Sequence, residues 1–379
     1  MNNNHDPKDN NLVKSFNQES LPKSTSRPRY FGIDILRIFS CYMVMQIHSG
    51  EYYYLDGHGL REGTGIFWMG IYNGLCYSSV PLFVMISGYL LLPVKTDIPT
   101  FLRTRFTRVL FPFFFWATIY SFYFLIIKRI NIKECFLNIP KIFVNYGTEI
   151  GHLWYIYMLI GIYLFAPIIS PWIKQATIYQ FIYFLSFWIV SCCLGYLHLI
   201  FPQIWGECSW NNTPMLQSFT GHMGYAVLGA FIKIHLDPNE NYNFYWLGFI
   251  FLGIGYAITT IIFEYQYCYA KIKPPIHIEV SKDFHSINVA MISCGFFLLL
   301  RKIQCNNQKI VAFCKDVALK SYGMYLAHIL ILDQFHLLFD PNNKRPYIFI
   351  PLISICTYIV TYIVIKLISC IPYSKYIIG

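Results

Sequence analysis

Charged side chains are scarce in this sequence. Asp, Glu, Lys and Arg together make up 13% of its 379 residues, about half of the roughly 25% that is usual in soluble domains. Hydrophobic residues make up 56%, which excludes an ordinary soluble globular protein. Apolar stretches of about 20 residues, long enough for a helix to cross the hydrocarbon core of a bilayer, recur after residue 30. The sequence therefore predicts an all-α fold, a polytopic bundle of membrane helices.

Metal-binding cysteine patterns are also missing. The 12 cysteines form no Cys-x-x-Cys pair, and no Cys/His spacing is typical of a zinc site. We therefore expect no metal. The formal net charge of +10 comes from Lys and Arg in short loops beside apolar spans, not from a solvated basic domain. We expect the lipid bilayer as a partner, and no nucleic acid.

The chain divides into two parts. Residues 1–29 are rich in Asn, Ser and Lys and lack periodic apolar residues, which predicts a disordered cytoplasmic tail; residues 30–379 then form one transmembrane domain. Windows of about 19 residues indicate about ten transmembrane helices, near 30–49, 71–92, 107–127, 151–170, 178–199, 217–235, 244–263, 285–300, 318–338 and 348–370. Roughly two thirds of the 29 Lys and Arg would then share one side with the N-terminus. The positive-inside rule thus predicts that both termini are cytoplasmic.

The first span, which contains LRIFSCYMVMQIHSG at 36–50, carries Arg37 and His48. Eleven helical positions place these side chains on one face, about 16 Å apart in depth. A charge inside a span costs at least about 2.5 kcal/mol, so it usually has a partner or a function; Asp34, one turn earlier, is the obvious partner of Arg37. Two interpretations are open. Either Arg37 reaches the inner interface and His48 rests among headgroups, or His48 is a general base.

Five segments carry a resemblance to a known family. An Arg, ten residues and a His, preceded by IDILR, resembles the first helix of acyltransferase family three, multipass membrane enzymes that O-acylate cell-surface sugars. Four more segments are similar to that family's motifs in the same order: SVPLFVMISGYLL at 79–91, RFTRVLFP at 105–112, HLWYIYMLIGIYLFAPII at 152–169 and SYGMYLAH at 321–328. The resemblance implies a multi-pass O-acyltransferase of the cell (inner) membrane.

The resemblance also implies the two substrates. An acyl-CoA, with acetyl-CoA as the default, would bind on the cytoplasmic side, and the acceptor would be a surface carbohydrate or a lipid-linked glycan. His48 would be the catalytic base, and Arg37, paired with Asp34, would orient groups in the same channel.

Three arginines before the third span are the candidates for the donor site. Arg105 and Arg108 would hold the CoA phosphates, because guanidinium groups match phosphate geometry, and Arg103 would add to the same field. Without the motif, an ordinary positive-inside loop explains these residues equally well.

The candidate acceptor-binding residues are two pairs. Trp154, beside His152, could stack on a sugar or belong to the interfacial aromatic belt. Tyr325 and His328 lie three positions apart on one helix face; they either line a cavity or make an interhelical hydrogen bond. His222 carries the same two interpretations.

A second class of function also fits a polytopic helix bundle. A polytopic transporter or flippase of a glycolipid or small metabolite would also be a bundle with broken helices and polar residues in the membrane, although the two halves show no convincing internal repeat. The Ser-Gly pair at 87–88 is explained more simply by close backbone approach than by a nucleophilic serine.

Overall fold

The computed structural model describes residues 29–56, 59–60, 63–144, 150–201, 203, 215–216, 218–238, 244–269, 280–340, 342 and 344–379. Its elements are α1 Phe31–Glu51, β1 Leu55–Asp56, β2 Gly59–Leu60, α2 Gly65–Asn73, η1 Cys76–Ser78, α3 Ser79–Leu91, α4 Ile98–Ile126, α5 Ile132–Lys141, α7 Trp154–Gln175, α8 Ile178–Ile200, α9 Met223–Phe231, η4 Ile232–Leu236, α10 Tyr245–Glu264, η5 Tyr265–Tyr269, α11 Ile287–Leu300, α12 Gln308–Phe339, α13 Pro346–Ile368 and α14 Lys375–Ile378. Apart from the two-residue strands, which pair antiparallel, the regular structure of the described residues is helical. The all-α prediction is confirmed.

Each predicted span contains a helix, but fewer of these helices are long and apolar enough to cross a membrane than the ten predicted. Within the described residues, α4, α7, α8, α10 with η5, and α13 are long and apolar enough to cross a membrane. A sixth crossing is possible if α2 and the η1–α3 segment, which are bent by 48° against each other, form one broken span. Ten crossings and cytoplasmic termini stay predictions. The predicted tail lies outside the described residues, except for Arg29.

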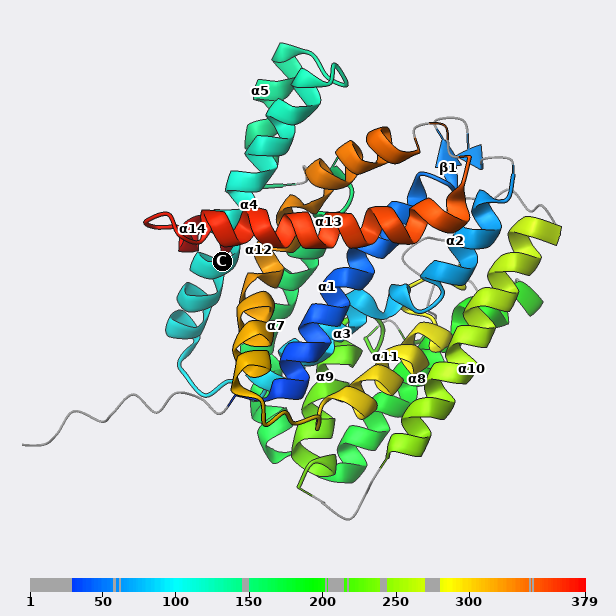
Figure 1. Ribbon diagram of the computed structural model, residues 1–379. Helices are drawn as coiled ribbons and strands as arrows, with labels where there is room; N and C mark the ends of the chain where they lie inside the picture. The colour runs from blue at the N-terminus through cyan, green and yellow to red at the C-terminus, as the bar shows by residue number, and fades with distance from the viewer. Residues whose placement is uncertain are drawn as a thin grey trace, which may run out of the picture. The chain divides into compact units, whose positions relative to one another are not determined.

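Helix α1 is the central element of the Phe31–Gly379 part. It packs against α3, α11, α12 and α13, and most of its residues are buried (Figure 1). Polar contacts tie it to its neighbours: the Gln46 amide donates to Asn73 Oδ1 at 3.3 Å, and Ser354 Oγ donates to Gln46 Oε1 at 2.5 Å. Hydrogen bonds of this kind fix helix pairs in an apolar medium. The helix that carries Arg37 and His48 is therefore held rigidly.

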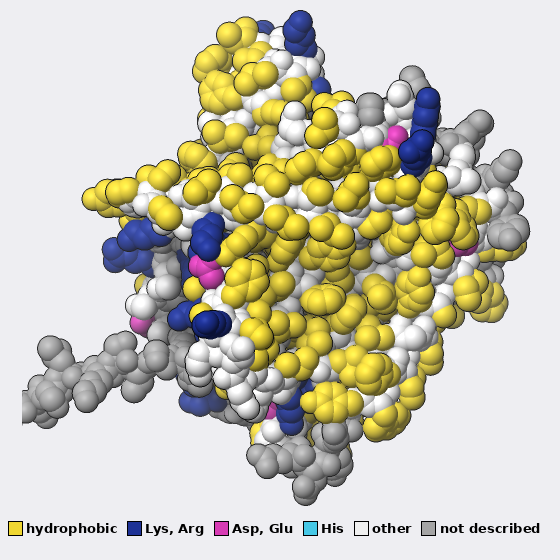
Figure 2. Space-filling view, viewed as in Figure 1, with side chains coloured by type: hydrophobic (Ala, Val, Ile, Leu, Met, Phe, Trp, Pro, Cys, Tyr) yellow, Lys and Arg dark blue, Asp and Glu magenta, His cyan; other side chains and the backbone are white. Residues whose placement is uncertain are grey.

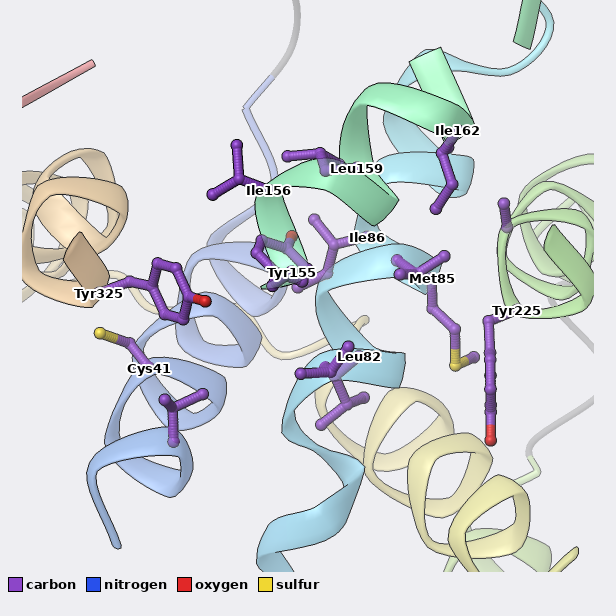
Figure 3. Close-up of a cluster of buried hydrophobic side chains, with 14 of the residues drawn as sticks. Cys41, Leu82, Met85, Ile86, Tyr155, Ile156, Leu159, Ile162, Tyr225 and Tyr325 are labelled. Atoms are coloured by element: carbon purple, nitrogen blue, oxygen red, sulfur yellow. The ribbon is translucent and has the colours of Figure 1, made fainter. Parts of the chain in front are cut away.

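The core fills the space between α1, α3, α7, α9 and α12. Figure 3 shows Cys41 of α1 facing Tyr325 of α12, with side chains of α3 and α7 packed beside them. Helices α3 and α9 come especially close: a Cβ on Gly88 would overlap the Ala226 carbonyl, and Ser87 Oγ donates to Phe83 O at 2.9 Å. The Ser-Gly pair is thus a site of close backbone approach, as predicted.

The outer surface is largely apolar. Figure 2 shows hydrophobic side chains over the visible face, with Lys and Arg mainly toward its margins. On α13 the exposed apolar residues are Tyr347, Ile348, Leu352, Ile355, Ile359, Ile363 and Leu367. Patches this large are rare on soluble monomers. Lipid is the environment that suits this surface, as expected for a membrane protein.

Candidate functional site

A pocket of about 400 Å³ lies where α1 ends. We call it the His48 pocket; its lining residues are His48, Glu51, Tyr52, Phe124, Arg129, Ile150, Gly151, His152, Trp154, Ile329, Leu332 and Asp333. They come from α1, α4, α12 and the segment that leads into α7. Two of the sequence-predicted acceptor residues, His152 and Trp154, therefore share a pocket with the predicted base.

His48 forms a carboxylate–imidazole pair in this pocket. Its Nδ1 lies 2.7 Å from Glu51 Oε2, and the two side chains are 18% and 50% exposed. A carboxylate only accepts hydrogen bonds, so His48 carries a proton on Nδ1, and in the neutral ring Nε2 keeps its lone pair. The same partner would stabilise the imidazolium after proton uptake, which is the role of the carboxylate in catalytic triads.

Three imidazoles lie close together, with His48 and His152 on the pocket wall and His328 buried behind it. The ring centroid of His48 lies 6.0 Å from that of His152 and 5.2 Å from that of His328, and His152 and His328 are 4.9 Å apart. Among the residues that the structure describes, no group of His, Cys, Asp and Glu is arranged to hold a metal ion. The three rings come from three segments that are far apart in the sequence.

Backbone carbonyls determine which ring nitrogen carries the proton in neutral His152 and His328. His152 Nδ1 lies 2.9 Å from Ile150 O, and His328 Nδ1 lies 2.5 Å from Tyr325 O. Because a carbonyl oxygen only accepts, both rings donate from Nδ1 and present Nε2 as an acceptor. Burial, aided by nearby His48, lowers the pKa of His152 to about 3, so this ring is neutral at ordinary pH.

Tyr325 and His328 lie behind the pocket wall. Both are buried, at 5% and 0% exposure, and neither is among the lining residues. The Tyr325 hydroxyl donates to the carbonyl of His152, so α12 is hydrogen-bonded to the turn just before α7. Through this bond, α12 holds the backbone that positions His152.

Trp154 presents its indole to the pocket and packs against a second cluster. Its ring stacks on Phe284, with centroids 5.5 Å apart, and lies 5.8 Å from His222. His285 Nε2 and His222 Nδ1 are 3.1 Å apart, and His285 Nδ1 lies 3.3 Å from Asp283 Oδ1. The Trp154 ring is therefore held in place by neighbouring protein side chains. His222 supports Trp154 from behind and does not line the pocket.

Asp333 is a pocket residue that the sequence did not identify. Its carboxylate accepts hydrogen bonds from the Tyr52 hydroxyl and, at 2.7 Å, from the Tyr123 hydroxyl. Tyr52 also stacks on His336, with ring centroids 3.9 Å apart. Arg129 lines the same pocket. The pocket thus combines carboxylates, aromatic rings and one guanidinium, a mixture that suits a polar, hydroxylated ligand.

The other predicted catalytic residues lie toward the opposite end of α1. Arg37 pairs with buried Asp34 at 3.6 Å, so the predicted partner is present. His48 lies eleven helical positions after Arg37, or about 16 Å along the axis. The guanidinium groups of Arg37, Arg105 and Arg108 all lie within electrostatic reach of Tyr163 on α7. Two of the three predicted donor-site arginines therefore belong to the neighbourhood of Arg37.

A second pocket, of about 470 Å³, lies beside the first turns of α4. We call it the basic pocket; it is lined by Arg103, Thr104, Thr107, Arg108, Lys375, Tyr376 and Gly379. Arg105 points elsewhere, with its guanidinium 5.7 Å from the centre of the Phe101 ring. Lys375 of α14 is a contributor that sequence reasoning missed.

The comparison with known families gives a match over most of the chain. The family model described as an acyltransferase domain matches residues 30–369. No curated protein and no solved structure gave a match. Because the matched range covers nearly the whole chain and includes both pockets' main elements, the protein is a membrane acyltransferase that belongs to acyltransferase family three.

Proposed function

We propose that this protein transfers an acyl group from acyl-CoA to a hydroxyl of a cell-surface or lipid-linked glycan, with His48 as the general base. The observation that carries the proposal is the His48–Glu51 pair on the wall of a pocket open enough for a ligand. A base must be unprotonated on the atom that faces the substrate, and the Nε2 of neutral His48, with Nδ1 donating to Glu51, would meet this condition.

The proposed reaction is a direct transfer. The acceptor hydroxyl gives its proton to His48 Nε2 while its oxygen attacks the thioester carbon. The carbon–sulfur bond then breaks, the thiolate leaves, and His48 returns the proton to sulfur. Glu51 stabilises the imidazolium in between, because it lies 2.7 Å from Nδ1.

The basic pocket is the proposed site of the CoA phosphates. Arg103, Arg108 and Lys375 line it, and guanidinium and ammonium groups are the usual ligands of phosphate. Arg105 and Arg37 both lie near Tyr163, and Arg37 is on α1, the helix that ends at the His48 pocket. A thioester at the far end of an extended pantetheine arm, rather than the nucleotide, would then reach the His48 pocket.

Acetyl is the proposed acyl group, and the cell (inner) membrane is the proposed location. The VPLFVMISGYL and HLW segments resemble the enzyme that O-acetylates enterobacterial common antigen, which supports an acetyl donor. The positive-inside distribution supports a cytoplasmic basic pocket and an outward-facing His48 pocket.

Acetyl-CoA consumption by the purified protein in lipid nanodiscs tests this function. His48→Ala should lower the rate of thiol release by at least about a hundredfold, whereas the control His198→Ala, on α8 outside the pocket, should leave it unchanged. Mass spectrometry of glycans from cells with and without the protein should show a difference of one acetyl group. A protein that moves a glycolipid across the bilayer without acyl-CoA, and equally well with His48→Ala, would be a flippase.

A further inference from the structure

A buried lysine lies beside the turn that follows α1. Lys282, in the segment before α11, is 6% exposed, and its ammonium nitrogen lies 3.7 Å from the centre of the Tyr54 ring and 4.4 Å from that of Phe263. The rings of Tyr267 and Tyr77 are centred 5.4 and 5.9 Å away. Aromatic ring faces attract a cation, and the attraction is strongest where water is excluded. The four rings therefore hold this side chain in place and favour its charged form.

The nearest of these rings connects Lys282 to the carboxylate beside the proposed base. The Tyr54 amide donates to the Glu51 carbonyl at 3.2 Å, so the ring and the carboxylate belong to one short turn. The Lys282 ammonium lies within electrostatic reach of Glu51, but Lys282 does not line the His48 pocket. Lys282 can thus act on the base through Glu51, without touching a substrate.

A carboxylate alone would favour the inactive charge state of the base. An anion 2.7 Å from His48 Nδ1 favours the imidazolium, which has no lone pair to take a proton. A nearby cation has the opposite effect, because it repels the imidazolium and stabilises the ionised carboxylate. The other charged or titratable groups of the pocket wall and the imidazole cluster are Asp333, Arg129, Tyr52, His152 and His328. Since Asp333 and Arg129 carry opposite charges, Lys282 is the cation of the described residues that can offset Glu51.

We propose that Lys282 is a positioning residue of the active site: its ammonium offsets the charge of Glu51 and thereby keeps His48 neutral, with Nε2 available for the proton of the acceptor hydroxyl. The proposal rests on the proposed acyltransfer reaction. A lysine with a structural role alone would hold the turn after α1 but would not set the protonation of His48. The two roles therefore differ in what a neutral substitute does to the titration of His48.

The test measures the protonation of His48 in the full-length protein in lipid nanodiscs. Diethyl pyrocarbonate reacts with neutral imidazole, so the rate at which His48 is modified, followed by peptide mass spectrometry over a series of pH values, gives the midpoint of its titration. In the wild type this midpoint should lie below about 7.5, within about one unit of the usual histidine value. Lys282→Met should move the midpoint upward by about half a pH unit to one unit, because a charge that opposes the imidazolium is gone. Lys282→Arg keeps the charge and should stay near the wild type.

The pH profile of acetyl-CoA consumption connects this charge to the reaction. The acidic limb of kcat/KM for thiol release should move upward by the same amount in Lys282→Met, so the value near pH 6 should fall by about three- to tenfold while the value near pH 9 hardly changes. Lys174→Met is the matched control, because Lys174 lies in the last turn of α7, whereas the pocket is at the start of that helix. This variant should keep both the wild-type midpoint and the wild-type profile.

The outcomes separate this proposal from the function on which it rests. An unchanged midpoint in Lys282→Met, or an equal shift in Lys282→Arg or Lys174→Met, contradicts the proposal. Thermal unfolding shows whether each variant is folded; Lys282→Gln replaces a Lys282→Met that does not fold, and if neither folds, a wild-type midpoint above about 7.5 contradicts the proposal and a lower one supports it. Absence of acetyl-CoA consumption by the wild type at every pH would instead contradict the acyltransfer function, while the modification of His48 would still test the charge.

Discussion

The His48 pocket and the basic pocket differ in chemistry more than in size. Their volumes are about 400 and 470 Å³. The first contains the carboxylates Glu51 and Asp333, the guanidinium of Arg129 and two histidines, whereas the second contains three cations and two threonine hydroxyls. A polyanion is therefore attracted more strongly by the second set than by the first. The difference in charge between the two pockets can therefore distinguish a phosphorylated donor from a neutral hydroxylated acceptor.

The largest expected effect comes from removing the charge beside the base. Glu51→Gln keeps the shape but places an amide next to His48 Nδ1, so the tautomer is no longer fixed and the imidazolium loses its counter-charge. We expect kcat to fall by roughly a hundredfold, less than for a buried triad carboxylate because Glu51 is 50% exposed. The steady-state rate of thiol release from acetyl-CoA by the protein in nanodiscs measures it.

Glu134→Gln is the matched control for this prediction. Glu134 caps α5 by accepting from the backbone of Asn131, and Gln can make the same bond. An unchanged kcat in Glu51→Gln would remove the carboxylate from the mechanism, and with it the main chemical difference between the two pockets.

The second-largest effect should show that the two ends of α1 act on different substrates. Arg105→Ala removes a guanidinium near Tyr163, so the KM for acetyl-CoA should rise by about thirtyfold, the range of one charge-assisted hydrogen bond, while the KM for the acceptor changes little. Arg129→Ala, in the His48 pocket, should act on the acceptor instead. Initial rates with each substrate varied in turn give both constants. Equal losses for donor and acceptor in Arg105→Ala would mean that the sorting by position is wrong.

The sequence predicted the helices and the residues of α1 because both follow from periodicity. Helical spacing alone placed Asp34 one turn from Arg37, and the structure shows the pair. Apolar runs located the spans, because burial in lipid requires a continuous apolar surface. The two interpretations of Tyr325 could not be separated in this way, since its partner, the His152 carbonyl, lies on another segment.

The details of the site that the sequence could not place depend on breaks in regular structure and on tertiary contacts. Glu51 joins His48 because α1 continues through Gly50, where a Cβ would overlap the Asn73 side chain; the predicted span ended at residue 49. His152 follows Gly151, whose φ of +61° is a backbone state that apolar patterns do not encode. Asp333 lies five positions after His328, which is a different helix face, so only the fold brings it to the pocket.

The smallest expected effect tests the residue that completes the basic pocket. Lys375 follows a turn in which Tyr373 has a φ of 62°, and its Nζ lies 5.0 Å from the centre of the Tyr376 ring. If Lys375 helps to bind the 3′-phosphate of CoA, Lys375→Met should reduce the preference for acetyl-CoA over acetyl-3′-dephospho-CoA by about fivefold, the size expected of an exposed ion pair. Lys366→Met is the matched control, because Lys366 lies over Tyr362 in the same manner but does not line the pocket. An equal change in both variants would indicate only a general loss of positive charge. A change confined to Lys375→Met would assign the nucleotide end of acetyl-CoA to the basic pocket, and the His48 pocket would then be the site of the acceptor.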